Sequence, residues 1–99
     1  SAEAIRLSEK AISLGAPLFN DGQQGACAAI YEVTIEAMIG LGGDRLGEDV
    51  TRRLRRGLEA GRAEHTATER AWAYRRALDD VYTTLSNRER ARPIAEMRR

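Results

Sequence analysis

Apolar residues recur at helical spacing along most of this chain, and that periodicity limits the possible folds more than any other feature. In the clearest stretch, three or four positions separate Ala71, Tyr74, Leu78, Val81 and Leu85. Such spacing places all five on one side of an α-helix. Alanine, leucine, arginine and glutamate dominate the sequence, which favours helix over strand. We therefore predict an all-α fold, either a four-helix antiparallel bundle or two stacked helical hairpins, with residues 1–99 forming a single helical domain.

Turn and capping residues suggest where these helices begin and end. The first helix is expected over 2–19, with a kink or local break near Pro17, because proline lacks an N–H donor and crowds the preceding turn. The second should follow the Asn20-Asp21-Gly22 turn, with Asp21 as its N-cap and Gln24 completing a capping box, and should run to about residue 41. Asp44 is the expected cap of the third helix.

The fourth helix has the strongest start signal in the second half of the chain. Thr66-Ala67-Thr68-Glu69 has the capping-box pattern, so we expect a helix over 67–85, ended by Ser86-Asn87. A short turn at Pro93 would then dock Ile94 and Met97 on the bundle.

The apolar stripes also predict which side chains form the core. On the first helix, two neighbouring stripes make a wide apolar face. Their residues are Ile5, Ser8, Ile12, Gly15 and Phe19 in one, and Ala4, Leu7, Ala11, Leu14 and Leu18 in the other. On the third, Leu46, Val50, Leu54 and Leu58 make a narrow stripe, beside which Gly57 and Gly61 allow another helix to approach closely. The regions around Tyr31 and Trp72 are expected to contribute to one core.

The first hairpin, residues 11–41, has leucine, small and aromatic residues at regular positions. These are Leu14-Gly15, Leu18, Cys27, Tyr31 and Thr34. The pattern resembles a tetratricopeptide unit: Leu14-Gly15 matches its Leu-Gly pair, Leu18 lies where its first aromatic would fall, and the other three lie at its small, aromatic and second small positions. The chain departs from the pattern at Ala11, where a tryptophan is expected, and at Pro17. It also lacks the terminal proline of the repeat. The hairpin is similar, too, to segments of uncharacterised bacterial helical proteins. The resemblance implies a scaffold that binds a protein or peptide.

The residues that carry enzyme chemistry are scarce. The single histidine, His65, precedes a helix cap, and the single cysteine, Cys27, is flanked by alanines, as a small buried hydrophobe would be. Zinc sites of the Cys/His type need more such ligands, and Ser8, Ser13 and Ser86 have no histidine near them in sequence. We expect no catalytic residues, no metal and no cofactor, and hence no enzyme. The longest apolar runs are too short to span a membrane.

Charge is divided unevenly along the chain. Residues 1–44 carry two basic and six acidic side chains, whereas residues 45–99 carry fourteen arginines and nine acids. Five arginines form a candidate binding surface for anions: Arg52, Arg53, Arg56, Arg75 and Arg76. The interleaved acids and the pI near 7.9 instead favour surface ion pairs over a dedicated nucleic-acid domain.

The function predicted from these observations is a small non-enzymatic helical module for protein–protein interaction or ligand binding. The alternative is anionic-ligand or nucleic-acid binding by the arginine-rich third and fourth helices. Self-association through the narrow stripe of the third helix is a further alternative. The chain begins at Ser1 rather than Met, so we expect either an exported, periplasmic bacterial protein or a cytoplasmic one.

Overall fold

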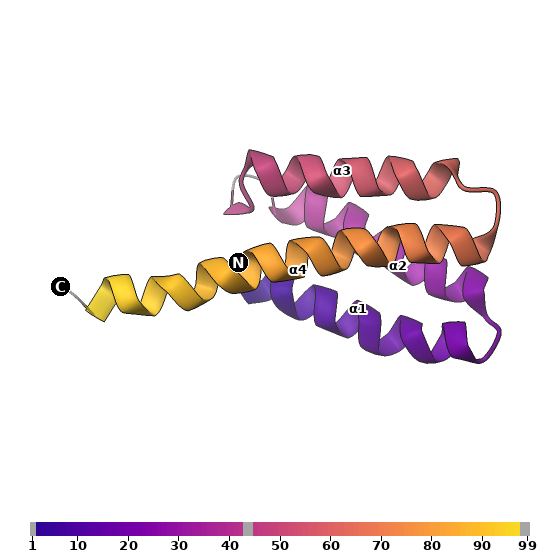
Figure 1. Cartoon of the computed structure of the whole chain (residues 1–99), viewed down its shortest axis with the longest axis horizontal. Helices are drawn as coiled ribbons and strands as arrows, with labels where there is room; N and C mark the ends of the chain where they lie inside the picture. Colours follow the sequence, from indigo (N-terminus) through magenta and orange to yellow (C-terminus); the bar gives the residue numbers. More distant parts are fainter. Residues whose placement is uncertain (1, 43–44, 98–99) are drawn as a thin grey trace.

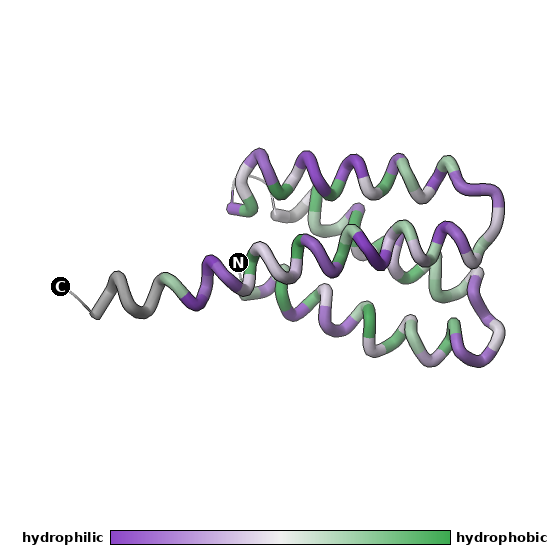
Figure 2. Tube along the Cα trace, viewed as in Figure 1, coloured by the Kyte–Doolittle hydropathy of each residue, from purple (hydrophilic) through white to green (hydrophobic). Residues whose placement is uncertain are grey.

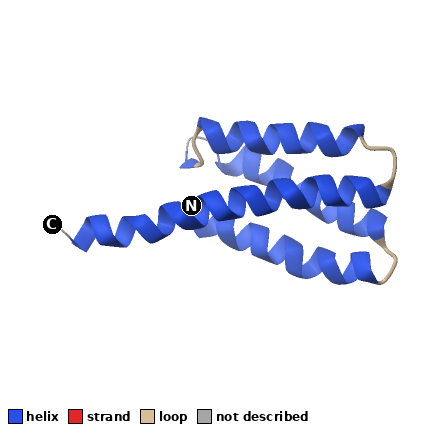
Figure 3. Cartoon of the chain, in the orientation of Figure 1, coloured by secondary structure: helices blue, strands red, loops and turns tan. Residues whose placement is uncertain are grey.

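The computed structural model describes residues 2–42 and 45–97, and it confirms the all-α prediction within them. The helices are α1 (Ala2–Asn20), α2 (Gln24–Gly42), α3 (Glu48–Ala63) and α4 (Ala67–Met97). No strand occurs in these ranges (Figure 3). Short turns join the helices, so that each lies antiparallel to the next in the chain (Figure 1). The result is a four-helix bundle.

The two hairpins, α1–α2 and α3–α4, join mainly through α2 and α4. The most extensive contacts lie within each hairpin and between α2 and α4, while α1 touches α4 and α3 touches α2 less. The core lies where the four helices meet. It consists of Ala4, Ala11, Cys27, Ala28, Tyr31, Ile35, Met38, Leu46, Val50, Leu54, Leu58, Ala71, Tyr74, Leu78, Val81 and Leu85.

Glycines permit the closest approaches between helices. A Cβ added at Gly57 would overlap Ala77 of α4, and one added at Gly61 would lie 2.5 Å from Cδ1 of Tyr74. In the first hairpin, a Cβ at Gly15 would lie 2.5 Å from Cε1 of Tyr31. The close packing predicted beside Gly57 and Gly61 is therefore confirmed.

The turn after α1 differs from the expected arrangement. Gly22 has a φ of 84°, and the backbone N–H groups of Gly22 and Gln23 donate to the carbonyls of Phe19 and Leu18 at 3.1 and 2.8 Å. This is a Schellman motif, in which glycine supplies the left-handed residue after the helix. Asp21 therefore lies at the end of α1 and does not cap α2.

The predicted capping box at Gln24 is also wrong. Helix α2 begins at Gln24 itself, whose side-chain amide donates to the carbonyl of Phe19 at 3.1 Å. The side chain is thus a second donor to a carbonyl at the end of α1 that already accepts from the Gly22 N–H. Asp44, the cap expected for α3, lies outside the described residues, and Gly47 occupies the N-cap position of that helix.

Pro17 does not break α1, which runs without interruption from Ala2 to Asn20. The residue is exposed, as is Ser13, whose carbonyl loses its usual helical donor. Water can satisfy a carbonyl on an exposed face, so proline costs less there than in the core.

The predicted end of the last helix at Leu85 is wrong, because α4 continues to Met97. Its start is as expected: the Glu69 N–H donates to Thr66 Oγ1 at 3.1 Å, and the Thr66 hydroxyl donates to Glu69 Oε1 at 2.9 Å. Serine and asparagine lower helix propensity only slightly, so Ser86-Asn87 cannot stop a helix that still gains contacts. Arg88 supplies such a contact, donating from Nη1 to the Leu46 carbonyl at 2.8 Å. Figure 1 shows the C-terminal part of α4 running past the other helices. The expected docking of Ile94 and Met97 lies outside the described side chains.

Several side chains of the predicted apolar stripes lie at the surface. Leu7 and Leu14 of α1 are 38% and 51% exposed. The Trp72 region contributes to the core through Ala71 and Tyr74, while Trp72 itself is 50% exposed. It lies two residues before Tyr74, about 200° around the helix, and so cannot share its direction.

Candidate functional site

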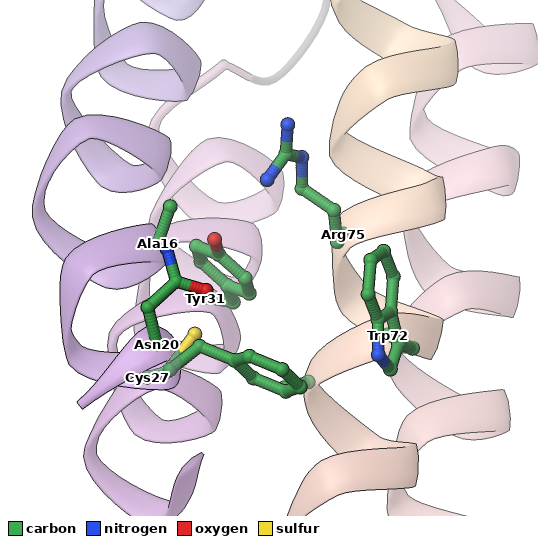
Figure 4. A pocket seen from close by; sticks show the side chains of 8 residues that line it. Ala16, Asn20, Cys27, Tyr31, Trp72 and Arg75 are labelled. Atoms are coloured by element: carbon green, nitrogen blue, oxygen red, sulfur yellow. The ribbon is translucent and has the colours of Figure 1, made fainter. Parts of the chain in front are cut away.

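A pocket of about 100 Å³ opens where α1, α2 and α4 meet (Figure 4). Each helix contributes to its wall: Ala16, Phe19 and Asn20 from α1, Cys27 and Tyr31 from α2, and Ala71, Trp72 and Arg75 from α4. The wall combines aromatic rings with several groups able to donate hydrogen bonds. Pockets of this composition bind small ligands in other proteins.

The wall contributed by α2 is rigidly packed. Tyr31 and Cys27 are 2% and 1% exposed, and they lie four residues apart, one turn of the helix. The ring of Tyr31 packs directly on the backbone of Gly15, so any larger residue there would displace it. Both side chains are therefore held in place by the bundle.

Arg75 is the charged group of the pocket. Its Nε donates to both carboxylate oxygens of Asp79 at 3.1 and 3.2 Å. The hydroxyl of Tyr31 points toward the guanidinium in Figure 4. Burial is the largest cause of the raised pKa of Tyr31, and contact with Cys27 adds to it, while Arg75 lowers it. Asp79 and Tyr31 raise the pKa of Arg75 against the opposing effect of its own burial.

Two aromatic rings form the outer edge of the pocket. Phe19 and Trp72 meet edge to face, with their centroids 5.6 Å apart and their planes at 72°. This is a favourable geometry for an aromatic pair. Trp72 is the only tryptophan of the chain and is half exposed, so it reports on anything that enters the pocket. Sequence reasoning missed this pocket because α4 brings Trp72 to α1 only in the folded bundle.

The five arginines predicted to bind anions do not share one surface. Arg53 lies between α3 and α4, where it pairs with Asp49 at 3.2 Å and Asp80 at 3.4 Å and donates to Thr84 at 3.1 Å. Arg75 belongs to the pocket. Three of the five, Arg52, Arg56 and Arg76, are exposed and make no ion pair with the described residues.

Arg62, which the sequence left unassigned, joins α3 to α2. Its Nε lies 2.9 Å from Glu32 and its Nη2 lies 3.3 Å from Glu36. The two glutamates are one turn apart on α2, so one guanidinium reaches both. The hydrogen bond to Glu32 is the main cause of the raised pKa of Arg62.

Tyr74 lies beside this cluster with its hydroxyl buried near Glu32, but without a well-formed hydrogen bond to any of the described residues. Burial, followed by the nearby charge of Glu32, raises its pKa. A buried hydroxyl without a partner costs about 1–3 kcal/mol in lost hydration. The ring of Tyr74 nonetheless packs at the centre of the core, against Gly61.

We expect Tyr74→Phe to leave stability unchanged or to raise it by about 1 kcal/mol, because it removes an unsatisfied hydroxyl and keeps the ring. The pKa of Tyr74 is raised in the folded state, so the unfolded chain loses this proton first as the pH rises. Ionisation of Tyr74 therefore leaves the free energy of unfolding unchanged below pH 10 and lowers it as the pH rises further. The variant should therefore lose less stability above pH 10. Urea unfolding at neutral and alkaline pH measures both effects. A clear loss of stability at neutral pH would show that the hydroxyl is satisfied.

The narrow apolar stripe predicted for the third helix, of which Leu46 lies just before α3, is not available for self-association. Leu46, Val50 and Leu54 are at most 1% exposed, because they pack within the chain. That alternative is therefore wrong.

The exposed side of α2 is apolar. Among the side chains of α2 that the structure describes, the exposed ones are Gly25, Ala26, Ala29, Val33, Glu36 and Gly40, so Glu36 is the only charged residue in this set. Val33, at 65%, is the most exposed large hydrophobic residue of the described chain. By contrast, α3 is mostly hydrophilic in Figure 2. Its exposed residues are Glu48, Asp49, Arg52, Arg55, Arg56, Glu59, Ala60, Arg62 and Ala63. Helix α2 therefore lacks the polar face that a surface helix normally has.

The part of the chain that the structure describes contains neither a cluster of metal-binding side chains nor a helix able to span a membrane. No three residues among its histidines, cysteines, aspartates and glutamates are placed to hold a metal ion. Among the same residues, no helix has the length and hydropathy needed to cross a bilayer.

Comparison with known proteins identifies no relative of this chain. No protein-family model, curated protein or solved structure matches the chain.

Proposed function

We propose that this chain is a small non-enzymatic module that binds a protein or peptide partner through the exposed side of α2. The observation that supports this is the near absence of charge among the exposed residues of α2, with Val33 at their centre. Exposed apolar patches on small proteins commonly mark sites of protein association. The tetratricopeptide resemblance, which implies the same class of function, is compatible with this face.

Selection of peptides from a random library on the immobilised protein tests the proposal. We expect an enriched consensus with apolar side chains, since these would cover Val33 and its alanine neighbours. The selected peptides should bind Val33→Asp at least about tenfold more weakly, because the carboxylate would lose water without gaining a partner.

Thr83→Asp is the matched control, because Thr83 is an exposed residue on α4. It introduces the same charge away from α2 and should leave binding unchanged. Failure to enrich any consensus, or equal binding to Val33→Asp, would contradict the proposal. A dimer that Val33→Asp dissociates in sedimentation experiments would identify a second copy of the chain as the partner.

The second candidate function is binding of an anionic ligand or nucleic acid, favoured because Arg52 and Arg56 make no ion pair with the residues that the structure describes. Both are exposed on α3 and lie one turn apart. Binding to single- or double-stranded nucleic acid at low salt should weaken on Arg52→Ala plus Arg56→Ala, and the salt dependence should fall by about two released counterions. The absence of any complex at low salt would rule out the nucleic-acid form of this candidate.

A further inference from the structure

We propose that the pocket between α1, α2 and α4 binds a small planar carboxylate, with the carboxylate on Arg75 and the planar group against Phe19 and Trp72. Neither the fold nor the resemblance assigns this site. It is also separate from the apolar side of α2, because Val33 lies two residues, or about 200°, from Tyr31 on that helix.

Arg75 has donors available for such a ligand. Both of its hydrogen bonds to Asp79 come from Nε, which leaves the two Nη groups on the remaining edge of the guanidinium as donors, with the Tyr31 hydroxyl as their neighbour. That edge matches the two oxygens of a carboxylate. The side chain is only 32% exposed, so a hydrogen bond made there competes less with water than one on an open surface.

Asp79 and Tyr31 orient the guanidinium before any ligand arrives. Asp79 holds Nε from the next turn of α4, and the Tyr31 hydroxyl faces the guanidinium from α2. Tyr31 in turn packs on Gly15 and is almost fully buried. A donor held in place by packed neighbours loses little freedom when it binds.

The aromatic pair selects for a planar group. Phe19 and Trp72 present an edge and a face at the opening, 5.6 Å apart at their centroids. A third ring can add to such a pair with the same offset or edge-to-face geometry. The pocket volume of about 100 Å³ admits part of a single ring, while the open side at Trp72 leaves room for the rest.

Other ligand classes fit the pocket less well. A purely apolar group would bury the Nη donors of Arg75 without a partner, at a cost in desolvation. A cation would meet the guanidinium with the same charge. A planar carboxylate satisfies both the donors and the rings.

Benzoate is the test ligand, with benzamide as a neutral analogue of the same shape and acetate as a carboxylate without the ring. Binding is followed by the fluorescence of Trp72 and by the NMR signal of its indole N–H. We expect benzoate to bind with a dissociation constant on the order of 1 mM, as suits a ligand of its size that stays partly exposed. Benzamide and acetate should each bind at least about tenfold more weakly.

Two variants test the charge and the volume of the pocket separately. Arg75→Gln removes the charge, and Ala16→Leu fills the cavity while keeping Arg75. Each should weaken benzoate binding at least about tenfold. Arg76→Gln is the matched control, because Arg76 is next in sequence, exposed, and without an ion pair in the described part of the chain. This variant should bind benzoate as tightly as the unaltered chain. Circular dichroism shows whether Arg75→Gln folds. If it does not fold, the loss of benzoate binding in Ala16→Leu is the test of the pocket.

Several results would overturn the proposal. No saturable response to benzoate at about 10 mM, roughly ten times the expected dissociation constant, would do so. Equal binding of benzamide would remove the role of the carboxylate. Full binding by Ala16→Leu, or equal losses in Arg75→Gln and Arg76→Gln, would place the ligand outside the pocket. None of these results affects the peptide-selection experiment on α2. Either proposal can therefore be disproved without the other.

Discussion

Gly61→Ala is expected to lower the free energy of unfolding by about 1–3 kcal/mol, the usual cost of overpacking a core. The added Cβ would lie 2.5 Å from Cδ1 and 2.6 Å from Cζ of Tyr74. Tyr74 is fully buried, so its ring cannot move aside without disturbing Leu78 and the rest of the core. The loss should outweigh the gain of about 1 kcal/mol that alanine offers over glycine within a helix. Urea unfolding followed by far-ultraviolet circular dichroism measures the difference.

Gly40→Ala is the matched control for this prediction. Gly40 is an exposed glycine within α2, and a Cβ added there would meet no atom within 4 Å. The same substitution should therefore raise stability by about 0.4–1 kcal/mol. Opposite signs for the two variants would confirm that Tyr74 requires a glycine opposite it. Stabilisation by both would show that α3 and α4 can separate slightly without cost.

Leu54→Ala is expected to have the larger effect of the two main predictions, a loss of about 2–5 kcal/mol in the free energy of unfolding. Leu54 is 0% exposed and lies in the stripe of α3 that packs within the bundle. The substitution removes apolar contacts and leaves a cavity that rigid neighbours fill only in part. For a domain of this size, such a loss corresponds to a fall of at least about 8 °C in the unfolding temperature.

Leu14→Ala controls for the chemistry of this substitution. Leu14 has the same side chain in a helix but is 51% exposed, so its removal should change stability by no more than about 0.5 kcal/mol. Calorimetry on both variants tests the contrast. Similar losses at the two positions would mean that Leu14 is covered in solution, as it would be in a dimer.

The helices and the core were largely predictable because they depend on local signals. The Thr66 capping box and the stripe from Ala71 to Leu85 each involve residues within a few turns of one another. The end of α4 was not predictable in this way. Its continuation past Asn87 accompanies a hydrogen bond from Arg88 to Leu46, forty-two positions earlier in the chain.

The candidate site was much less accessible to sequence reasoning. Arg75 was singled out for its charge, but its grouping with Arg52, Arg53 and Arg56 rested only on their shared place on the arginine-rich third and fourth helices. The bundle instead pairs Arg53 with Asp80 and places Arg75 beside Tyr31. Phe19 and Trp72 lie more than fifty residues apart, and no periodicity links them.

The sequence by itself determined that this chain is helical, that a turn follows α1, that α4 begins after Thr66, and which side of α3 and α4 is buried. Side-chain period, capping and glycine conformation act over one or two turns, so they can be read without knowing the fold. Only the tertiary structure decided which helices touch, which arginines remain unpaired, and that Trp72 stands at the edge of a pocket rather than in the core. Those outcomes depend on the angles and distances at which helices pack, and these are set by contacts between residues far apart in the chain.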